Sequence, residues 1–363
     1  MRVLHILDEI RYSGAETMLT SASAFWRGKG VGLSALATAK NEGAYAEVFR
    51  KNGFTVFHIP YSLSLKFVFQ LFSLMKREKF DVVHIHPERA FFQYAIAAWL
   101  ARVPVKISTV HHIYAYRSWH VIRPWIYRHI CKYVFRVQYV SNSLSGQANE
   151  KQLYGLNHVY IPNWFDSRIY NQGAINTNQD NDLRKRMEIA DDKILLVSLG
   201  GNTEYKNYDK VIEALGTDDL RNRYVYMHLG HDDRHELIPL ANKHQVEFKS
   251  MGCVKNTIPY LLSADLVMMP SREEGFGIAA VETMAIGVPI CLSRRPALID
   301  FKQLTDKLFW CEPTVEGIRE FLKGFKKLSE FERITIGEAL IAVSERFTIE
   351  RGANAYLDLY RIS

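Results

Sequence analysis

Residues 270–289 have the sequence PSREEGFGIAAVETMAIGVP and directly follow a run of four apolar residues. An apolar run, a loop with two glycines, a helical pattern and a Gly-Val-Pro stop predict the order strand, loop, helix, strand. Gly275 and Gly277 allow the backbone to approach a ligand, and free N–H groups at the start of the helix favour an anion such as a diphosphate. Glu274 and Glu282 could hold two hydroxylated parts of the same ligand. A plain strand-to-helix turn with solvated carboxylates is the alternative interpretation.

The same alternation of strand and helix extends over both halves of the chain. It predicts an α/β protein with two Rossmann-like, doubly wound domains facing each other across a cleft, with ligands at the carboxyl ends of the strands. In the first half the expected strands are Val3–Leu7, Gly32–Ala37, Thr55–Ile59, Asp81–His86 and Val105–Val110, and the expected helices are Ala15–Gly28, Leu65–Arg77 and Ala90–Leu100. In the second half the expected strands are Ile194–Leu199, Tyr224–Leu229, Val246–Lys249, Leu266–Met269 and Pro289–Leu292, and the expected helices are Asp209–Leu215, Leu237–His244, Ile258–Ser263 and Ile278–Ala285.

The polar stretch Asn171–Arg184 separates the two series and predicts a linker or an exposed loop. We therefore expect four segments, which are an N-terminal domain (1–168), a linker (169–190), a second domain (191–345) and a terminal helix (346–363). A length of 363 residues suits two domains of this size.

Composition narrows the class of protein further. Hydrophobic residues make up 48% of the chain, but no apolar run reaches the ~20 residues of a membrane span. The first residues lack the apolar core of a signal peptide, and the four cysteines are scattered without metal-binding spacing. We expect a cytoplasmic protein with reduced thiols and no zinc site.

The net charge of +7 is concentrated in the first half of the chain, because residues 89–149 contain no Asp or Glu. Within this region, residues 114–136 interleave basic and aromatic side chains. One interpretation is a helix that packs its aromatic residues inward and leaves its charges in water. The other is peripheral contact with an anionic membrane, with Arg123, Arg128 and Lys132 as the contacting cations. No nucleic-acid motif is present, so we do not expect nucleic-acid binding.

The string at 270–289 resembles the E-x7-E segment of the retaining family 4 glycosyltransferases (glycosyl transferases group 1, GT-B type), with the P-S-x-x-E-G-F-G opening and the E-x-M-A-x-G-x-P close of that family. The resemblance implies that Glu274 is catalytic and contacts the transferred sugar. It implies that Glu282 holds the ribose. The diphosphate would lie against Ser271 and the backbone of Gly275, Phe276, Gly277 and Ile278.

The segment LGGNTEYKN at 199–207 resembles the strand-end loop of the family, where a lysine pairs with the donor phosphates. By this resemblance Lys206 and Asn207 belong to the donor site, and a flexible ammonium suits a diphosphate. The family usually has an arginine five or six residues before that lysine, whereas this chain has Gly200-Gly201. Backbone N–H groups, Arg272 or Arg294 are the candidate substitutes.

Near the N-terminus, Gly14 resembles the glycine of the family's first loop and would contact the donor phosphate or the acceptor through its backbone. Ser13 and Glu16 also fit a capping box, which is a sufficient structural reason for both. His111, with His112 as the alternative, matches the family's strand-end histidine that faces the donor sugar and is the second candidate catalytic residue. His86, at the end of another strand, is a candidate on the acceptor side.

The resemblance implies that 1–168 is the acceptor-side domain, that 191–345 binds the donor, and that the terminal helix at 346–363 returns to the first domain. It also implies a metal-independent hexosyltransferase that requires no cofactor. It would move a sugar from a nucleotide-diphosphate sugar, with UDP or GDP as the expected base, to a lipid-linked or saccharide acceptor. Surface polysaccharide or glycoconjugate assembly is the expected setting, in the cytoplasm or on the inner face of the membrane. The D-x-D string at 180–182 lies in the polar stretch and is expected to be solvated and not to hold a metal.

Two other functions stay open. The Gly-Gly in place of arginine, Trp164 where relatives have glycine, and His231 where a small or acidic residue is common would suit a non-catalytic partner subunit that binds nucleotide sugars. A sugar-nucleotide epimerase on the same scaffold is the second alternative.

Overall fold

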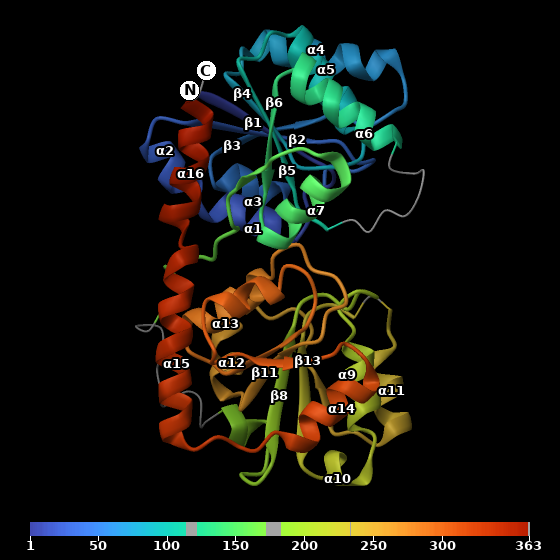
Figure 1. Cartoon of the computed structure of the whole chain (residues 1–363), viewed down its shortest axis with the longest axis vertical. Helices are drawn as coiled ribbons and strands as arrows, with labels where there is room; N and C mark the ends of the chain where they lie inside the picture. The colour runs from blue at the N-terminus through green and yellow to red at the C-terminus, as the bar shows by residue number, and fades with distance from the viewer. Residues whose placement is uncertain (114–121, 172–182, 233, 362–363) are drawn as a thin grey trace. The chain divides into compact units, whose positions relative to one another are not determined.

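The computed structural model describes residues 1–113, 122–171, 183–232 and 234–361. The chain forms two compact units (Figure 1). Unit 1 contains Met1–Trp164 together with Ile349–Ser363, and unit 2 contains Phe165–Thr348. The D-x-D string and residues 114–121 of the basic stretch lie outside the described residues.

Unit 1 is built on a parallel sheet in the order β3-β2-β1-β4-β5-β6-β7. The strands are β1 (Arg2–Leu7), β2 (Gly32–Ala37), β3 (Phe54–His58), β4 (Val82–Ile85), β5 (Val105–Val110), β6 (Val137–Ser141) and β7 (Val159–Tyr160). The central strands β4 and β5 are buried along their whole length, as expected for a parallel sheet covered on both faces. In the register of β1 with β4, His5 lies opposite His84.

The helices of unit 1 are α1 (Gly14–Ser21), α2 (Ser23–Gly28), α3 (Ala46–Lys51), α4 (Leu65–Glu78), α5 (Phe91–Leu100), α6 (Ile122–His129), a π-helical turn (Ile130–Val134), α7 (Leu144–Tyr154) and α16 (Ile349–Arg361). The expected single helix Ala15–Gly28 was wrong, because the chain breaks at Ala22 into α1 and α2. Just before the break, the hydroxyls of Thr20 and Ser21 donate to backbone carbonyls of the preceding turn, and such bonds can bend a helix.

Unit 2 contains a second parallel sheet, in the order β10-β9-β8-β11-β12-β13. Its strands are β8 (Ile194–Leu199), β9 (Tyr224–Leu229), β10 (Phe248–Ser250), β11 (Leu266–Met269), β12 (Ile290–Ser293) and β13 (Phe309–Cys311). Its helices are α9 (Tyr208–Leu215), α10 (Asp218–Arg221), α11 (Leu237–His244), α12 (Ile258–Ser263), α13 (Ile278–Ala285), a 3-10 turn (Ile299–Gln303), α14 (Val315–Gly324), α15 (Glu330–Ser344) and a second 3-10 turn (Glu345–Phe347). The predicted fold class, α/β with two Rossmann-like doubly wound units, is confirmed.

The last helix, α16, packs on the rest of unit 1, and its last turn lies near the N-terminus (Figure 1). The indole of Trp26 donates to the carbonyl of Ala353 over 3.1 Å, and the indole of Trp164 donates to the carbonyl of Met18 over 3.1 Å. Trp164 is fully buried and lies against Gly352, where an added Cβ would stand 2.2 Å from the indole ring. The tryptophan that departs from the family pattern is therefore a core residue of unit 1. None of the helices described is both long and apolar enough to cross a membrane.

Candidate functional site

The loop after β11 brings the backbone of residues 275–278 to the start of α13. Gly277 precedes the helix with φ of +95°, a conformation that L side chains rarely adopt. A Cβ at this position would also stand 2.8 Å from Leu298. Gly275 and Phe276 are buried, and the Phe276 ring packs on Phe301 in the core. Phe276 can therefore contribute only its backbone to a ligand, while the first N–H groups of α13, beginning at Ile278, lack partners within the helix.

Lys206 and Glu274 lie together in unit 2. The ammonium Nζ of Lys206 donates to Oε1 of Glu274 over 2.6 Å, and the hydroxyl of Ser271 donates to the same oxygen over 2.8 Å. Both charged side chains keep part of their surface in solvent. The pair therefore offers a cation and an anion side by side near the start of α13.

The loop after β8 is fastened to the loop after β11 by Asn207. Its side-chain amide is buried and donates to the carbonyls of Pro270 and Pro313, over 3.2 and 2.9 Å. The backbone N–H of Arg272 also donates to the carbonyl of Tyr205 over 2.7 Å. The Asn207 side chain thus holds the loop of Lys206 against the loop of Ser271, and its place in the donor site stays a prediction.

Glu282 occupies α13 one turn after Ile278 and is half-buried. Burial, with a smaller contribution from the neighbouring charge of Asp166, raises the pKa of its carboxyl to about 8. Tyr170 is also close, since the Glu282 charge adds to the effect of burial in raising the tyrosine pKa. An acid in this environment is mostly protonated at neutral pH until a partner stabilises its charge.

Close backbone packing occupies the place of the arginine that relatives carry. Gly200 has φ of +121°, and a Cβ on Gly230 would stand 2.2 Å from the Gly200 carbonyl oxygen. Of the two arginines among the candidate substitutes, Arg272 already has a partner, because its guanidinium donates to the Glu204 carbonyl over 2.7 Å. The exposed side chain of Arg294 forms no hydrogen bond or ion pair within the described part of the chain.

In unit 1, Gly14 is exposed and opens α1. The capping box expected at Ser13 and Glu16 was wrong. The Ser13 hydroxyl donates to the Glu16 carboxylate, and the Ser13 side chain caps no backbone N–H. Glu16 is buried, and burial raises the pKa of its carboxyl. A buried carboxyl group without a hydrogen-bond partner is costly, and the Ser13 hydroxyl supplies that partner and not a helix cap.

Three histidines form a row of hydrogen bonds across the central strands of unit 1. Nδ1 of His86 lies 2.9 Å from Nε2 of His111, and Nε2 of His86 lies 3.1 Å from Nδ1 of His5. Burial lowers the pKa of His5 to about 3 and of His111 to about 4, so both are neutral at pH 7. The sequence analysis missed His5. Its position in the first expected strand was a usable indication, because β1 and β4 are neighbours in this topology.

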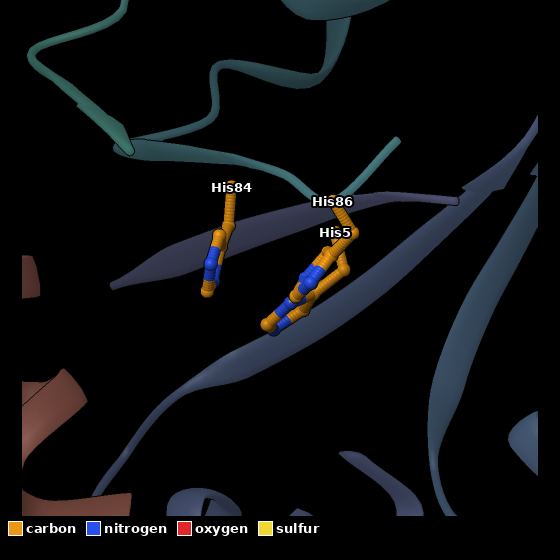
Figure 2. Close-up of side chains that lie close together, drawn as sticks. All are labelled: His5, His84 and His86. Carbon is orange, nitrogen blue, oxygen red and sulfur yellow. The ribbon is translucent and has the colours of Figure 1, made fainter. Parts of the chain in front are cut away.

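His84 belongs to the same group of side chains but has other partners. Figure 2 shows His5, His84 and His86 projecting to one side of the sheet, and one ring nitrogen of each lies within 4.8 Å of the others. Nδ1 of His84 lies 2.8 Å from the hydroxyl of Tyr360, and Nε2 lies 2.7 Å from the hydroxyl of Thr109. His84 thus connects α16 to β5 two residues before His111.

In the described part of the basic stretch, residues 122–136, one of the three cations expected to contact a membrane is buried. Arg128 is 4% exposed and donates to Glu150 over 2.9 Å and to Glu88 over 3.1 Å. The expectation that Arg128 contacts a membrane is therefore wrong, because its charge is buried and paired. The aromatic side chains are not all packed inward either, since Trp125 is 44% and Tyr133 is 69% exposed.

Both halves of the chain match family models. Residues 12–168 match the model "Glycosyltransferase Family 4", and residues 179–335 match "Glycosyl transferases group 1". The O-antigen biosynthesis glycosyltransferase WclY of Escherichia coli is 24% identical over 296 residues, which are 78% of this chain and 79% of that protein. The putative glycosyltransferase EpsF of Bacillus subtilis is 24% identical over 315 residues, which are 80% and 79% of the two chains. The structure of HepE from Anabaena, determined with UDP, superposes with a TM-score of 0.82 at 19% identity and covers 99% of both chains.

Proposed function

Since the chain belongs to the GT-B glycosyltransferases of group 1 and family 4, we propose that it moves a sugar from a UDP- or GDP-sugar to a hydroxyl of a lipid-linked or saccharide acceptor. The relative WclY, an O-antigen biosynthesis glycosyltransferase, supports a role in surface polysaccharide assembly. The structure of HepE with UDP supports a nucleotide-sugar donor. The observation that carries the proposal is the group formed by Lys206, Glu274 and the start of α13.

We propose that unit 2 binds the donor. The N–H groups at 275–278 and the ammonium of Lys206 would stabilise the negative charge of the diphosphate, most of all as the nucleoside diphosphate leaves. Glu282 would accept hydrogen bonds from the ribose hydroxyls. Ser271 and Asn207 would hold Glu274 and Lys206 in position, and Arg294 would supply the charge of the arginine that this chain lacks.

In unit 1, His111 would face the transferred sugar, with Gly14 contacting phosphate or acceptor through its backbone and His86 on the acceptor side. His111 is neutral at pH 7, so it would act as a hydrogen-bond partner of the sugar and not as a cation. Glu274 would be the catalytic residue that unit 2 contributes. We propose that transfer retains the anomeric configuration and needs no metal.

The test combines binding with product analysis. Calorimetry against UDP, GDP and ADP should show one tight nucleotide, and its sugar should be turned over to free nucleoside diphosphate and a glycosylated acceptor in the presence of EDTA. Glu274→Ala should abolish transfer, while Glu273→Ala, its exposed neighbour, should leave transfer unchanged. Proton NMR of the first product then reports the anomeric configuration.

Other outcomes select the alternatives. A bound nucleotide sugar that is never consumed with any acceptor would indicate a non-catalytic partner subunit. An isomeric nucleotide sugar as product would indicate an epimerase. Trp164 no longer favours the non-catalytic function, because its side chain lies in the core of unit 1. Loss of transfer on addition of EDTA would contradict metal independence.

We further propose that α6 and the π-helical turn contact an anionic membrane. Ile122, Trp125 and Ile126 are exposed on α6, and Tyr133 and Val134 are exposed on the turn. Exposed aromatic and aliphatic side chains beside cations suit the interfacial region of a bilayer. Arg123, which lies 5.2 Å from the centre of the Tyr127 ring, and the partly exposed Lys132 would supply the charge.

Flotation with vesicles tests this surface. Wild-type protein should float with vesicles that contain phosphatidylglycerol and stay behind with pure phosphatidylcholine. The double variant Arg123→Glu/Lys132→Glu should lose flotation, and Lys326→Glu, an exposed reversal in unit 2, should keep it. Failure of the wild type to float with anionic vesicles would contradict the proposal.

A further inference from the structure

The histidine row in unit 1 has a direction, because a neutral imidazole has one N–H and one lone pair. The two N···N contacts, at 2.9 and 3.1 Å, each need a donor on one side and an acceptor on the other. His5, His86 and His111 must therefore all carry their proton on the same type of nitrogen. Either all three are Nε2–H tautomers or all three are Nδ1–H tautomers.

The inner end of the row selects between the two. Nε2 of His5 is buried and has no hydrogen-bond partner among the described residues. Its ring lies between aromatic neighbours, stacked on Trp26 at 5.7 Å and edge-on to Phe54 at 6.1 Å. In the Nε2–H arrangement this atom would be a buried donor without an acceptor, which native structures avoid most strictly. In the Nδ1–H arrangement it is an unused lone pair.

We propose that His5 and His86 are positioning residues that fix His111 as the Nδ1–H tautomer. The Nδ1–H of His5 donates to Nε2 of His86, and the Nδ1–H of His86 donates to Nε2 of His111. Nδ1 of His111 is then the donor that remains for a ligand, and none of the residues described accepts from it. The tautomer assignment needs only the geometry, whereas its effect on sugar transfer rests on the proposed function of His111.

Burial agrees with this arrangement, since it lowers the pKa of each ring in the row and keeps all three neutral. Neutral rings are required, because an extra proton would turn an acceptor nitrogen into a donor and break one contact. His111 therefore cannot use Nε2 as a general base, and its Nδ1–H is suited to donate to a sugar hydroxyl or to the leaving oxygen.

A metal ion is the competing occupant of this region, because His5, His84 and His86 lie close together (Figure 2). The hydrogen bonds argue against it. Both nitrogens of His84 face hydroxyls, and both nitrogens of His86 face other histidines. Only the lone pair on Nε2 of His5 is left, and one lone pair does not make a metal site.

Long-range ¹H–¹⁵N correlation spectra of ¹⁵N-histidine-labelled protein report each tautomer directly. Histidine substitutions assign the signals. His228 in unit 2 is an internal reference, because its Nε2 lies 2.8 Å from the Gly200 carbonyl and must carry the proton. We expect His228 as the Nε2–H tautomer and His5, His86 and His111 as Nδ1–H tautomers in one spectrum. An Nε2–H pattern at His111 would overturn the proposal.

Two substitutions of His86 form a matched pair. In His86→Asn the amide nitrogen takes the place of Nδ1 and can still donate to His111. In His86→Gln the amide reaches only the place of Nε2, so His111 loses its donor. We expect a single Nδ1–H form of His111 in His86→Asn and a tautomer mixture in His86→Gln, with the His228 signal unchanged in both. Equal spectra for the two variants would contradict the role of His86.

Two further measurements separate the possible failures. Titration of the wild type with Co²⁺ should give no absorption band from bound metal. A band that appears in the wild type and is absent from His5→Phe would indicate a metal site and overturn the proposed tautomers. In turnover assays, kcat of His86→Gln should fall about tenfold relative to His86→Asn, with KM for the nucleotide sugar unchanged. If the tautomers are as proposed but both variants turn over equally, the tautomer assignment stands and the proposed catalytic role of His111 fails.

Discussion

The raised pKa of Glu282 predicts that nucleotide binding depends on pH. In the free protein the carboxyl has a pKa of about 8, because it is half-buried and lies near Asp166. If the ribose hydroxyls donate to the ionised carboxylate, binding must first remove this proton. The ionised fraction is roughly 0.1 at pH 7 and roughly 0.9 at pH 9. We therefore expect the Kd for the nucleoside diphosphate to fall about tenfold over this range, ~1.4 kcal/mol.

Calorimetry measures the same effect at a single pH. With buffers of different ionisation enthalpy at pH 7, wild-type protein should release about 0.9 proton per nucleotide bound. Titration of the nucleotide phosphate adds to the signal, so the Glu282→Gln variant is the control. That variant should bind more weakly, and the excess proton release of the wild type should be absent from it. Equal proton release by both proteins would refute the assignment of Glu282 to the ribose.

The same shift has an opposite consequence for stability. Below pH 4.5 the carboxyl is protonated in both the folded and the unfolded chain. Between pH 4.5 and 8 the unfolded chain releases the proton and the folded chain keeps it, so this group lowers the free energy of unfolding as pH rises. Without nucleotide, Glu282→Gln should therefore have a higher Tm than the wild type at pH 8.5 and nearly the same Tm at pH 4.5. A Tm difference that does not change with pH would contradict the shifted pKa.

Three further predictions concern single contacts. In calorimetry, Lys206→Gln should weaken nucleotide binding by about 1.5–3 kcal/mol. Glu274→Gln frees the Lys206 ammonium from its ion pair, so this variant should bind the nucleotide at least as tightly as the wild type and fail to transfer sugar. Gly352→Ala should lower the free energy of unfolding by about 1–3 kcal/mol, because the added Cβ meets the Trp164 ring. The double variant Gly352→Ala/Trp164→Ala should lose less free energy of unfolding than the two single variants together. Losses that add up in urea melts would contradict this contact. Ser329→Ala should cost ~1 kcal/mol because it removes the capping box of α15, and an unchanged urea midpoint would show that the cap contributes nothing.

The layered fold was predictable because buried parallel strands are continuous apolar runs. Ile194–Leu199 and Tyr224–Leu229 were located to the residue for this reason. The ends of helices were predicted less accurately where side chains form hydrogen bonds with backbone carbonyls, as at the break after Ser21. Periodicity carries no information about such bonds.

Two segments with the same local sequence pattern show why some side-chain contacts cannot be predicted from the sequence. Ser13 and Glu16 have the same S-x-x-E spacing as Ser329 and Glu332, yet only the second pair forms a capping box. The difference is burial, because Glu16 is enclosed by unit 1 whereas Glu332 is at the surface. Burial of one side chain depends on the whole fold and not on its neighbours in sequence.

The candidate site shows the same division. The loop after β11 could be identified because its residues are consecutive in the chain. The partners of His86 are harder to identify, since they lie 81 and 25 residues away in the chain and only the order of the strands brings them together. Arg128 was misplaced for the related reason that its two carboxylate partners lie outside the acid-free region in which it was found.

The placement of α16 affects the order in which the chain folds on the ribosome. Unit 2 is one continuous segment and is complete once Thr348 has been synthesised. Unit 1 is not, because Trp26 and His84 find their partners Ala353 and Tyr360 only at the end of the chain. At ~5–20 residues per second, the first half waits roughly 10–40 s for its last helix. The order in which the two units can complete their folds is thus the reverse of the order in which they are synthesised. Unit 1 begins to emerge first and completes its fold last.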